Sequence, residues 1–406
     1  HIAETLQDLG EGVEVATAYP GTPSSEIPDT LFPISQQTDL YFEYSTNEKV
    51  ALEVAIGAAD AGLRVLCTMK HVGLNVAADP LNTVAYTGVK GALVILTADE
   101  PSMHSSQNEQ DNRWYAKLSL LPMLEPSDPA EAQRLTRMAF DLSHELQCPV
   151  LLRTTTRMNH SRGVCTFFEM RPREFRGHFD KDIFRWAPVP AVARGLRVKQ
   201  LEALPRRAEA TRALGVDRIE GEAGRLGIVA SGVAYLYVKE LLTELGVADR
   251  VRVAKITTIA PFPSETIREL AEKCDELLVV EELEPYVETE VRALLQELGI
   301  DRPVRGKGEG WVPRHFELSP DRLRPVIARF TGVEHTPAEA SDPPALPGRP
   351  PMLCAGCSHR TTYYAVKSVA DADPDTFFAT DIGCYTLGLR PPLNTADAFI
   401  CMGSSV

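Results

Sequence analysis

Residues 92–97 read ALVILT, an unbroken apolar run with the length of a β-strand. Three similar runs lie along the same part of the chain: VEVATAY at 13–19, VLCTM at 65–69 and PVLLRT at 149–154. Between them, residues 48–61 carry Ala, Leu and Ile at helical spacing, and Gly62 ends that pattern. Short apolar strands that alternate with helices predict βα units around a buried parallel sheet. We therefore expect residues 1–165 to form an α/β domain.

The strand-and-helix pattern stops and then returns further along the chain. Residues 166–225 cluster Arg, Pro and Glu without periodicity, which indicates a linker arm that is ordered or wraps its neighbour. Strand-like runs reappear at 226–230, 251–257 and 276–280, so residues 226–332 predict a second, smaller α/β domain.

The remainder of the chain divides into a linker and a third segment. Residues 333–351 are rich in proline and poor in apolar residues, which is typical of a linker. Residues 352–406 begin another α/β pattern, with a strand expected at 398–402 and a turn at 403–405. Because about 55 residues are too few to complete such a domain, we expect this one to be partial.

Composition narrows the class of protein. The chain has 406 residues, a formal net charge of −14 and 24% charged residues, which is typical of a globular protein. An acidic balance does not favour a nucleic acid as partner, and no apolar stretch is long enough to span a membrane. The start of the chain looks clipped, and no secretory segment is visible there. The eight cysteines therefore do not predict a disulfide framework, and we expect a cytoplasmic protein.

Glu48 is the first polar residue that invites a functional interpretation. Ser45 and Glu48 have the spacing of a capping box at the start of the helix predicted from residue 48. On composition alone, capping is the favoured role. The sequence alone does not distinguish a capping glutamate from one that transfers a proton, so both roles stay open.

Two turns after predicted strands carry further candidates. Thr22 lies in the turn PGTPSS at 20–25, which either binds a carboxylate or simply places Ser24 or Ser25 as a helix cap. Lys70 and His71 directly follow the strand at 65–69, where doubly wound sheets place ligand-binding loops. The alternative is that both are ordinary surface residues.

Cys354 and Cys357 form a Cys-x-x-Cys turn, and Cys384 follows 27 residues later. A [4Fe–4S] cluster would need a fourth thiolate, a zinc site would add His359, and an interpretation without metal is also open. Both metals stay open from the spacing.

Several long motifs resemble the thiamine-diphosphate-dependent 2-oxoacid:ferredoxin oxidoreductases, and the likeness extends to the alpha subunits of the indolepyruvate-type enzymes. The motifs keep the family's order along the chain: YPGTPSSE at 19–26, STNEKVALE at 45–53, KHVGLN at 70–75, HSSQNEQ at 104–110, CAGCSHR at 354–360 and DIGCY at 381–385. The resemblance implies a pyrimidine-binding domain (1–165), a transketolase C-terminal-like domain (226–332) and part of a pyrophosphate-binding domain (352–406).

The resemblance also implies roles for individual residues. It makes Glu48 the catalytic residue, because thiamine enzymes place a glutamate against a ring nitrogen of the aminopyrimidine. It places Gly21, Thr22, Lys70, His71 and Lys117 in the 2-oxoacid pocket, with Arg113 as a further candidate. A glycine at 21, where pyruvate-type relatives carry a bulkier side chain, implies room for an aryl group.

The last segment would contribute to the cofactor and to a metal cluster. The cofactor-binding residues implied there are Gly383, Cys384, Tyr385, Gly403 and Ser404. Cys354, Cys357 and Cys384 match ligands of a [4Fe–4S] cluster, whose fourth ligand is expected beyond Val406. The main Mg²⁺ ligands are also expected beyond that residue, because the family's Gly-Asp-Gly motif is not in this sequence.

The activity implied is oxidative decarboxylation of an aryl 2-oxoacid, such as indolepyruvate, to its acyl-coenzyme A with reduction of ferredoxin. A beta subunit would complete a hetero-oligomer. Two alternatives stay open: a non-redox thiamine-dependent decarboxylase or lyase, and a non-catalytic scaffold chain of such a complex.

Overall fold

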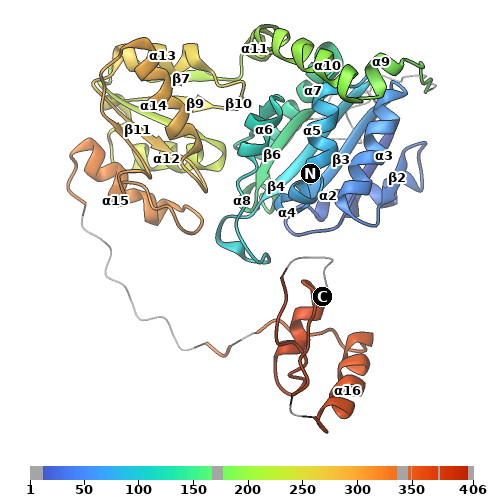
Figure 1. The fold of residues 1–406 in the computed structure, drawn as a ribbon. Coiled ribbons are helices and arrows are strands. Elements are labelled where there is room, and N and C mark those ends of the chain that lie inside the picture. The colour runs from blue at the N-terminus through green and yellow to red at the C-terminus, as the bar shows by residue number, and fades with distance from the viewer. Residues whose placement is uncertain (1–11, 167–176, 336–345, 349, 374, 401–406) are drawn as a thin grey trace. The chain divides into compact units, whose positions relative to one another are not determined.

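The computed structural model describes residues 12–166, 177–335, 346–348, 350–373 and 375–400 (Figure 1). The chain divides into two compact units, residues 1–336 and residues 337–406. The first unit contains two β-sheets with helices on both faces, and the second is small and contains one long helix.

The first sheet has seven strands in the order β10-β5-β6-β4-β3-β1-β2, and it is parallel except for β10. The strands predicted from the apolar runs all form: they are β1 (Val15–Ala18), β3 (Arg64–Lys70), β4 (Ala92–Asp99) and β6 (Val150–Thr155). The remaining strands are β2 (Tyr41–Tyr44), β5 (Met123–Leu124) and β10 (Thr258–Ala260).

Alternate residues of the central strands feed two different cores. Cys67 and Ile95 pack on one face, whereas Leu66 and Val94 pack on the other. The first face is covered by helices α3 (Glu48–Asp60), α4 (His71–Val76), α5 (Ala78–Thr87) and α6 (Arg113–Ser119). The second face is covered by helices α2 (Glu26–Ser35), α7 (Pro129–Leu146) and α8 (Thr156–Asn159). Burial of both faces explains why these strands are continuous apolar runs rather than alternating ones.

The second sheet has five strands in the order β12-β11-β8-β9-β7. Its strands are β7 (Arg218–Glu220), β8 (Leu226–Ser231), β9 (Val251–Ile256), β11 (Glu276–Val280) and β12 (Val304–Arg305). Helices α12 (Gly232–Glu244) and α15 (Pro320–Thr331) pack on one face, and α13 (Ser264–Lys273) and α14 (Tyr286–Leu298) pack on the other. The three strands predicted from sequence in this region are confirmed.

The region predicted as an aperiodic arm is mostly helical in its described part. It contains α9 (Ile183–Trp186), α10 (Pro190–Glu202) and α11 (Leu204–Ala213). These helices lie along the first domain: Gln200 donates to the carbonyl oxygens of Ala85 (3.1 Å) and Ser119 (2.9 Å). Few of their apolar residues are buried, and the polar side chains of Gln200 and Arg207 attach them through bonds to backbone carbonyl oxygens, which explains the weak apolar pattern.

The boundary expected at 225/226 also needs correction. Strand β7 comes from the predicted arm but pairs antiparallel with β9 in the second sheet. Conversely, β10 comes from the predicted second domain but pairs with β5 in the first sheet. The two α/β domains therefore exchange edge strands, which joins them into one unit.

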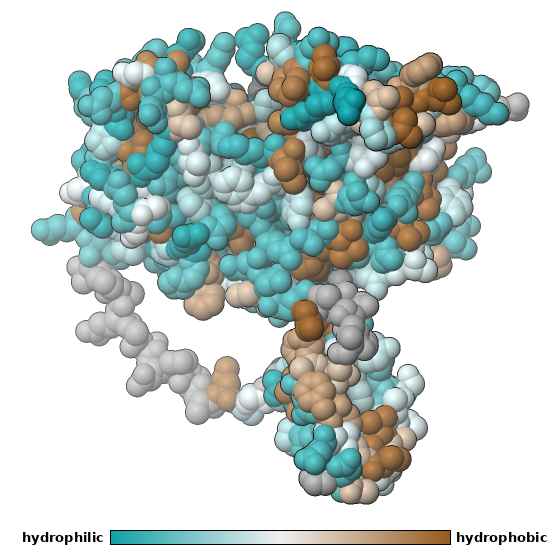
Figure 2. Space-filling model, viewed as in Figure 1, coloured by the Kyte–Doolittle hydropathy of each residue, from teal (hydrophilic) through white to brown (hydrophobic). Residues whose placement is uncertain are grey.

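The second unit contains α16 (Ser358–Ala370) and a 3₁₀ turn at Cys384–Leu389. The strand predicted at 398–402 is not formed in its described part, because residues 398–400 make only one bridge, between Ala398 and Ala379. Large apolar side chains such as Val369 and Ile400 remain exposed, and Figure 2 shows such residues in brown on this unit. A segment this short has little interior in which to bury them.

No helix among the described residues is both long and apolar enough to cross a lipid bilayer.

Candidate functional site

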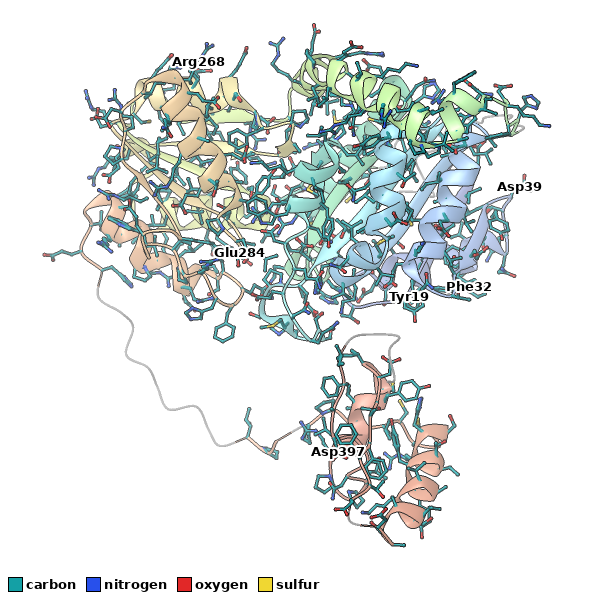
Figure 3. All side chains as sticks on the ribbon, viewed as in Figure 1. Tyr19, Phe32, Asp39, Arg268, Glu284 and Asp397 are labelled. Carbon is teal, nitrogen blue, oxygen red and sulfur yellow. The ribbon has the colours of Figure 1, made fainter. Side chains whose placement is uncertain are left out.

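The candidate residues gather where three neighbouring parallel strands end. Strands β4, β3 and β1 are adjacent in the first sheet, so the segments that follow them meet at one edge. Gly21 follows β1, Lys70 ends β3, and Glu100 follows β4. Tyr19, the first residue after β1, is labelled in Figure 3 at this edge.

Glu48 is the first residue of α3, and it is not part of a capping box. Asn47 caps the helix, since its side chain accepts from the Val50 amide at 2.9 Å. Ser45 instead donates its hydroxyl to Glu43 at 2.7 Å. The capping interpretation of Ser45 and Glu48 is therefore wrong, and the Glu48 side chain is available for another role.

The Glu48 carboxyl group is buried without a full set of partners. The residue is 3% exposed, and its Oε1 atom has no hydrogen-bond partner. Gly73 of α4 makes room for it, since a Cβ atom at Gly73 would lie 2.6 Å from Glu48 Cγ. Burial raises the pKa of Glu48, and the charge of Lys70 opposes this shift. The group is thus able to hold a proton more readily than an exposed glutamate.

Lys70 is also buried, contrary to the surface alternative. Its ammonium group donates to the carbonyl oxygen of Ser105 at 3.2 Å and lies 3.7 Å from Glu100 Oε2. Burial lowers the pKa of Lys70, whereas the charges of Glu100 and Glu48 work in the opposite direction. Lys70 therefore brings a cation to a site that already contains two buried carboxylates.

His71 is buried and neutral near pH 7. Burial, together with the charge of Lys70, lowers its pKa to about 4. The Nε2 atom lies 3.0 Å from the carbonyl oxygen of Asn108, which can only accept, so this nitrogen carries the proton. His71 therefore acts here as a neutral hydrogen-bond donor that holds the 104–110 segment.

The turn after β1 differs from its prediction in one respect. The room expected beside Gly21 is filled by the stem of Lys70, because a Cβ atom at Gly21 would lie 2.7 Å from Lys70 Cδ. Thr22 is exposed on this turn, and Ser24 closes it by donating to the Gly21 carbonyl oxygen at 2.8 Å. Ser25 stands at the helix start without a side-chain capping bond.

Lys117 and Arg113 are held by the second domain instead of by this edge. Lys117 is half-exposed and forms an ion pair with Glu290 of α14. Arg113 is fully buried, with ion pairs to Asp111 and Glu281, and also donates to the carbonyl oxygen of Glu284 (labelled in Figure 3). Both residues therefore connect the two α/β domains, and neither has a contact with Lys70 or Glu48 in the described part of the chain.

Cys354, Cys357 and Cys384, the described cysteines of the second unit, are free thiols, and two of them share neighbours. Cys357 Sγ lies 3.2 Å from His359 Nδ1, and the His359 ring packs edge-on against Tyr385 at 4.7 Å. Tyr363 donates to the Tyr385 carbonyl oxygen at 2.7 Å, next to Cys384. Among the described residues, no three His, Cys, Asp or Glu side chains converge into a ready metal site. Gly383 starts the 3₁₀ turn, whereas Gly403 and Ser404 lie outside the described residues.

Two residues of the site escape sequence reasoning. Gly73 lies inside a quoted motif, but only the packing of Glu48 against it shows why a side chain is excluded. Glu100 follows an apolar strand directly, which is the same signal that singles out Lys70. Polar residues at the ends of neighbouring parallel strands are therefore the sequence signal shared by Lys70 and Glu100.

Comparison with known proteins identifies the family. Residues 9–187 match the family of pyruvate flavodoxin/ferredoxin oxidoreductases, thiamine diphosphate-binding, and residues 215–307 match the indolepyruvate ferredoxin oxidoreductase middle domain. The chain is 46% identical, over 98% of its length, to indolepyruvate oxidoreductase subunit IorA of Methanothermobacter thermautotrophicus. The chain belongs to the 2-oxoacid:ferredoxin oxidoreductase family. It spans 65% of the length of that curated relative.

Solved structures of this family and of a related fold share the architecture. A 2-oxoglutarate:ferredoxin oxidoreductase from Magnetococcus marinus has a TM-score of 0.58 at 12% identity, covering 81% of this chain and 64% of that chain. A split-gene transketolase has a TM-score of 0.54 at 16% identity, covering 82% of this chain and 97% of that chain. At these identities the likeness concerns the fold alone.

The surroundings of Glu48 in the first α/β domain suit one part of thiamine diphosphate. A buried carboxylate oxygen without a partner fits a ring nitrogen that carries or shares a proton, and Glu48 Oε1 is such an atom. Because Gly73 has no side chain, the Glu48 carboxyl group can occupy this position.

Proposed function

We propose that this chain is the thiamine-binding subunit of an enzyme that oxidatively decarboxylates an aryl 2-oxoacid, such as indolepyruvate, to its acyl-coenzyme A and reduces ferredoxin. The observation that carries the proposal is the buried Glu48 carboxyl group with its unpartnered Oε1 atom. The names of the relatives, and the coenzyme A bound in the Magnetococcus enzyme, support the substrate class and the acyl acceptor.

Glu48 is proposed as the catalytic residue. Thiamine diphosphate, when bound, supplies a carbon nucleophile that accepts the electrons left behind as CO₂ departs. Glu48 would share a proton with a ring nitrogen of the aminopyrimidine, and its burial favours the protonated carboxyl group needed for this role. Gly73 would hold Glu48 in position.

Lys70 and Thr22 are proposed to receive the 2-oxoacid, and His71 to support them by holding the 104–110 segment that Lys70 contacts. The Lys70 ammonium group is a buried cation at the strand-end edge, and a carboxylate is the ligand that such a charge favours. Thr22 is exposed and directly follows Gly21, which lies against the stem of Lys70. Because Lys117 is paired with Glu290, we leave it out of this pocket.

The remaining parts of the proposal concern the second unit and the partners. Cys354, Cys357 and Cys384 are proposed as thiolate ligands of a [4Fe–4S] cluster, and Gly383, Cys384 and Tyr385 as part of the pyrophosphate-binding domain. A beta subunit, ferredoxin and Mg²⁺ complete the system. The two α/β domains correspond to the pyrimidine-binding and transketolase C-terminal-like domains, as the two family matches support.

The test uses the full-length protein with its partner subunit. With thiamine diphosphate, Mg²⁺ and coenzyme A, it should reduce ferredoxin faster with indolepyruvate than with pyruvate. Decarboxylation without ferredoxin reduction would support the non-redox alternative instead, and no thiamine diphosphate binding would support a scaffold.

The cluster assignment has a separate test. Iron content after anaerobic purification should fall in Cys384→Ala and in Cys357→Ala. Cys165→Ala, a half-buried free cysteine of the first unit, is the matched control and should keep its iron. Full iron content in both of the first two variants would contradict the assignment.

A further inference from the structure

Glu100 is a buried carboxylate for which the proposed function has no role. The residue is 1% exposed and directly follows β4. Its Oε1 atom accepts from the Ser105 amide (3.0 Å) and from the Ser105 hydroxyl group (2.8 Å), and its Oε2 atom accepts from the Ser106 hydroxyl group. A carboxylate that receives three hydrogen bonds from one turn fixes that turn in place.

The same carboxylate also faces Lys70. Glu100 Oε2 lies 3.7 Å from Lys70 Nζ, and Lys70 donates to the carbonyl oxygen of Ser105. The ammonium group is therefore held on the β4 side by a charge and by a backbone oxygen. The stem of Lys70 is fixed as well, because it lies against Gly21.

Glu48 is the second buried carboxylate whose charge acts on Lys70, and it is not paired with it. The two residues influence each other electrostatically, yet Glu48 Oε1 has no hydrogen-bond partner, and Glu48 has no ion pair within the described residues. Two buried carboxylates thus compete for one buried ammonium group, and Glu100 holds it.

From this arrangement we propose that Glu100 is a positioning residue that retains the Lys70 ammonium group and so keeps Glu48 Oε1 free for the cofactor. The inference rests on the proposed thiamine role of Glu48. In the absence of the Glu100 charge, Lys70 turns to Glu48, and the oxygen that the aminopyrimidine needs becomes occupied.

The test compares four variants of the full-length protein in its complex, stripped of cofactor. Glu100→Gln keeps the shape and an acceptor for Ser105 but removes the charge. Thiamine diphosphate binding in the presence of Mg²⁺, measured by calorimetry without substrate, should weaken about tenfold, the scale of one lost hydrogen bond to a charged group. Glu100→Asp, which keeps the charge, should bind more tightly than Glu100→Gln.

A second substitution separates positioning from a merely structural role. Lys70→Met keeps the aliphatic stem over Gly21 but removes the ammonium group. In the Glu100→Gln background it should restore cofactor binding, since nothing is left to occupy Glu48; if Glu100 only holds the 105–106 turn, no such rescue occurs. Glu109→Gln is the matched control, because Glu109 accepts from the Ser102 amide in the same loop without an ion pair to Lys70, and it should bind like wild type.

The outcomes distinguish this inference from the proposed function. No thiamine diphosphate binding by the wild-type complex overturns the proposed function. Wild-type binding with an unchanged Glu100→Gln, or a weakened Glu100→Gln that Lys70→Met does not rescue, overturns the role of Glu100 alone.

Discussion

Two clusters of buried charge in the first unit differ in how completely their members are paired. At the junction of the α/β domains, Arg113 forms ion pairs with Asp111 and Glu281 at 2.5 Å. Beside it, Arg153 pairs with Asp99 and Glu125 at 2.6 Å. Every one of these charges has an opposite charge within hydrogen-bond distance.

The strand-end cluster is arranged differently. Lys70 is 3.7 Å from its carboxylate partner, and Glu48 has no ion pair in the described part of the chain. A buried carboxylate without a partner destabilises the fold unless something else binds it. Single atoms without a hydrogen-bond partner occur in both clusters, since Asp99 Oδ1 and Arg153 Nη2 also lack one. The difference lies in the ion pairs: every charge at the junction has one, whereas Glu48 has none among the described residues.

Glu48→Gln gives the largest expected effect and tests the ligand-binding cluster directly. Turnover of the full enzyme should fall by about 10²–10⁴-fold, because an amide cannot share the proton. The fold should be as stable as wild type or more so at pH 7, since burial raises the pKa of Glu48 and the ionised form therefore costs stability there.

The control for this variant lies on the same helix. Glu53 is exposed and 3.9 Å from Lys49, so Glu53→Gln should leave turnover unchanged. Wild-type turnover in Glu48→Gln would show that the unpaired carboxylate is not catalytic.

Arg113→Met tests the domain-joining cluster. Removing this cation leaves the buried Glu281 without an ion pair and Asp111 with only Arg153 at 3.9 Å, so the free energy of unfolding should fall by about 3–5 kcal/mol. Arg225→Met is the exposed comparison: Arg225 pairs with Asp275 at 2.5 Å on the surface, and its loss should cost far less stability than the loss of Arg113. Equal losses in urea denaturation would remove the distinction between the two kinds of pair.

His71 extends the comparison to pH. Its pKa is about 4 in the folded protein and about 6.5 in an unfolded chain, so the unfolded state binds the proton first as pH falls. The stability that the protein gains from keeping His71 neutral is complete above about pH 6.5 and is lost as pH falls toward 4. His71→Asn does not titrate, so it should lose up to about 3 kcal/mol less than wild type over that range.

Denaturation midpoints at several pH values measure this difference. His178→Asn, at an exposed histidine that lies 3.2 Å from Asp180, is the surface comparison. An unchanged acid dependence in His71→Asn would mean that His71 is not buried in solution.

Sequence patterns predicted the sheets better than they predicted the site. The strands around residues 65–69 and 92–97 are buried on both faces, so their apolar runs identify them without knowledge of their neighbours. Strands β7 and β10 are short and cross between domains, and their pairing depends on partners that are distant in sequence.

Within the site, the sequence allowed the candidate residues to be predicted but not the residues that they contact. The motif containing Glu48 drew attention to it, but the spacing to Ser45 suggested a capping role because sequence alone could not show that Asn47 makes the cap. The predicted room at Gly21 assumed an empty space, whereas a side chain 49 positions away in sequence fills it.

Gly21→Ala has the smallest expected effect and tests what occupies that space. A Cβ atom would lie 2.7 Å from Lys70 Cδ and 3.0 Å from Cγ, so the stem of Lys70 has to shift. Overpacking of this kind costs about 1 kcal/mol or more, and the KM for the 2-oxoacid should rise roughly fivefold while kcat changes little. Gly57→Ala is the control, since a Cβ atom there meets nothing within 4 Å, and KM should stay as in wild type.

The larger substitution Gly21→Ile then separates two uses of the space beside Gly21. If Lys70 fills it, as the structure shows, the displaced ammonium group impairs indolepyruvate and pyruvate alike, and the ratio of their turnover stays constant. If the aryl group of the substrate uses it, as the resemblance to aryl-specific enzymes implies, the preference shifts toward pyruvate. A constant ratio together with a raised KM for both acids would assign Gly21 to the positioning of Lys70. A shifted ratio would mean that Lys70 moves aside when the substrate binds, and that the strand-end cluster is rearranged by its ligand.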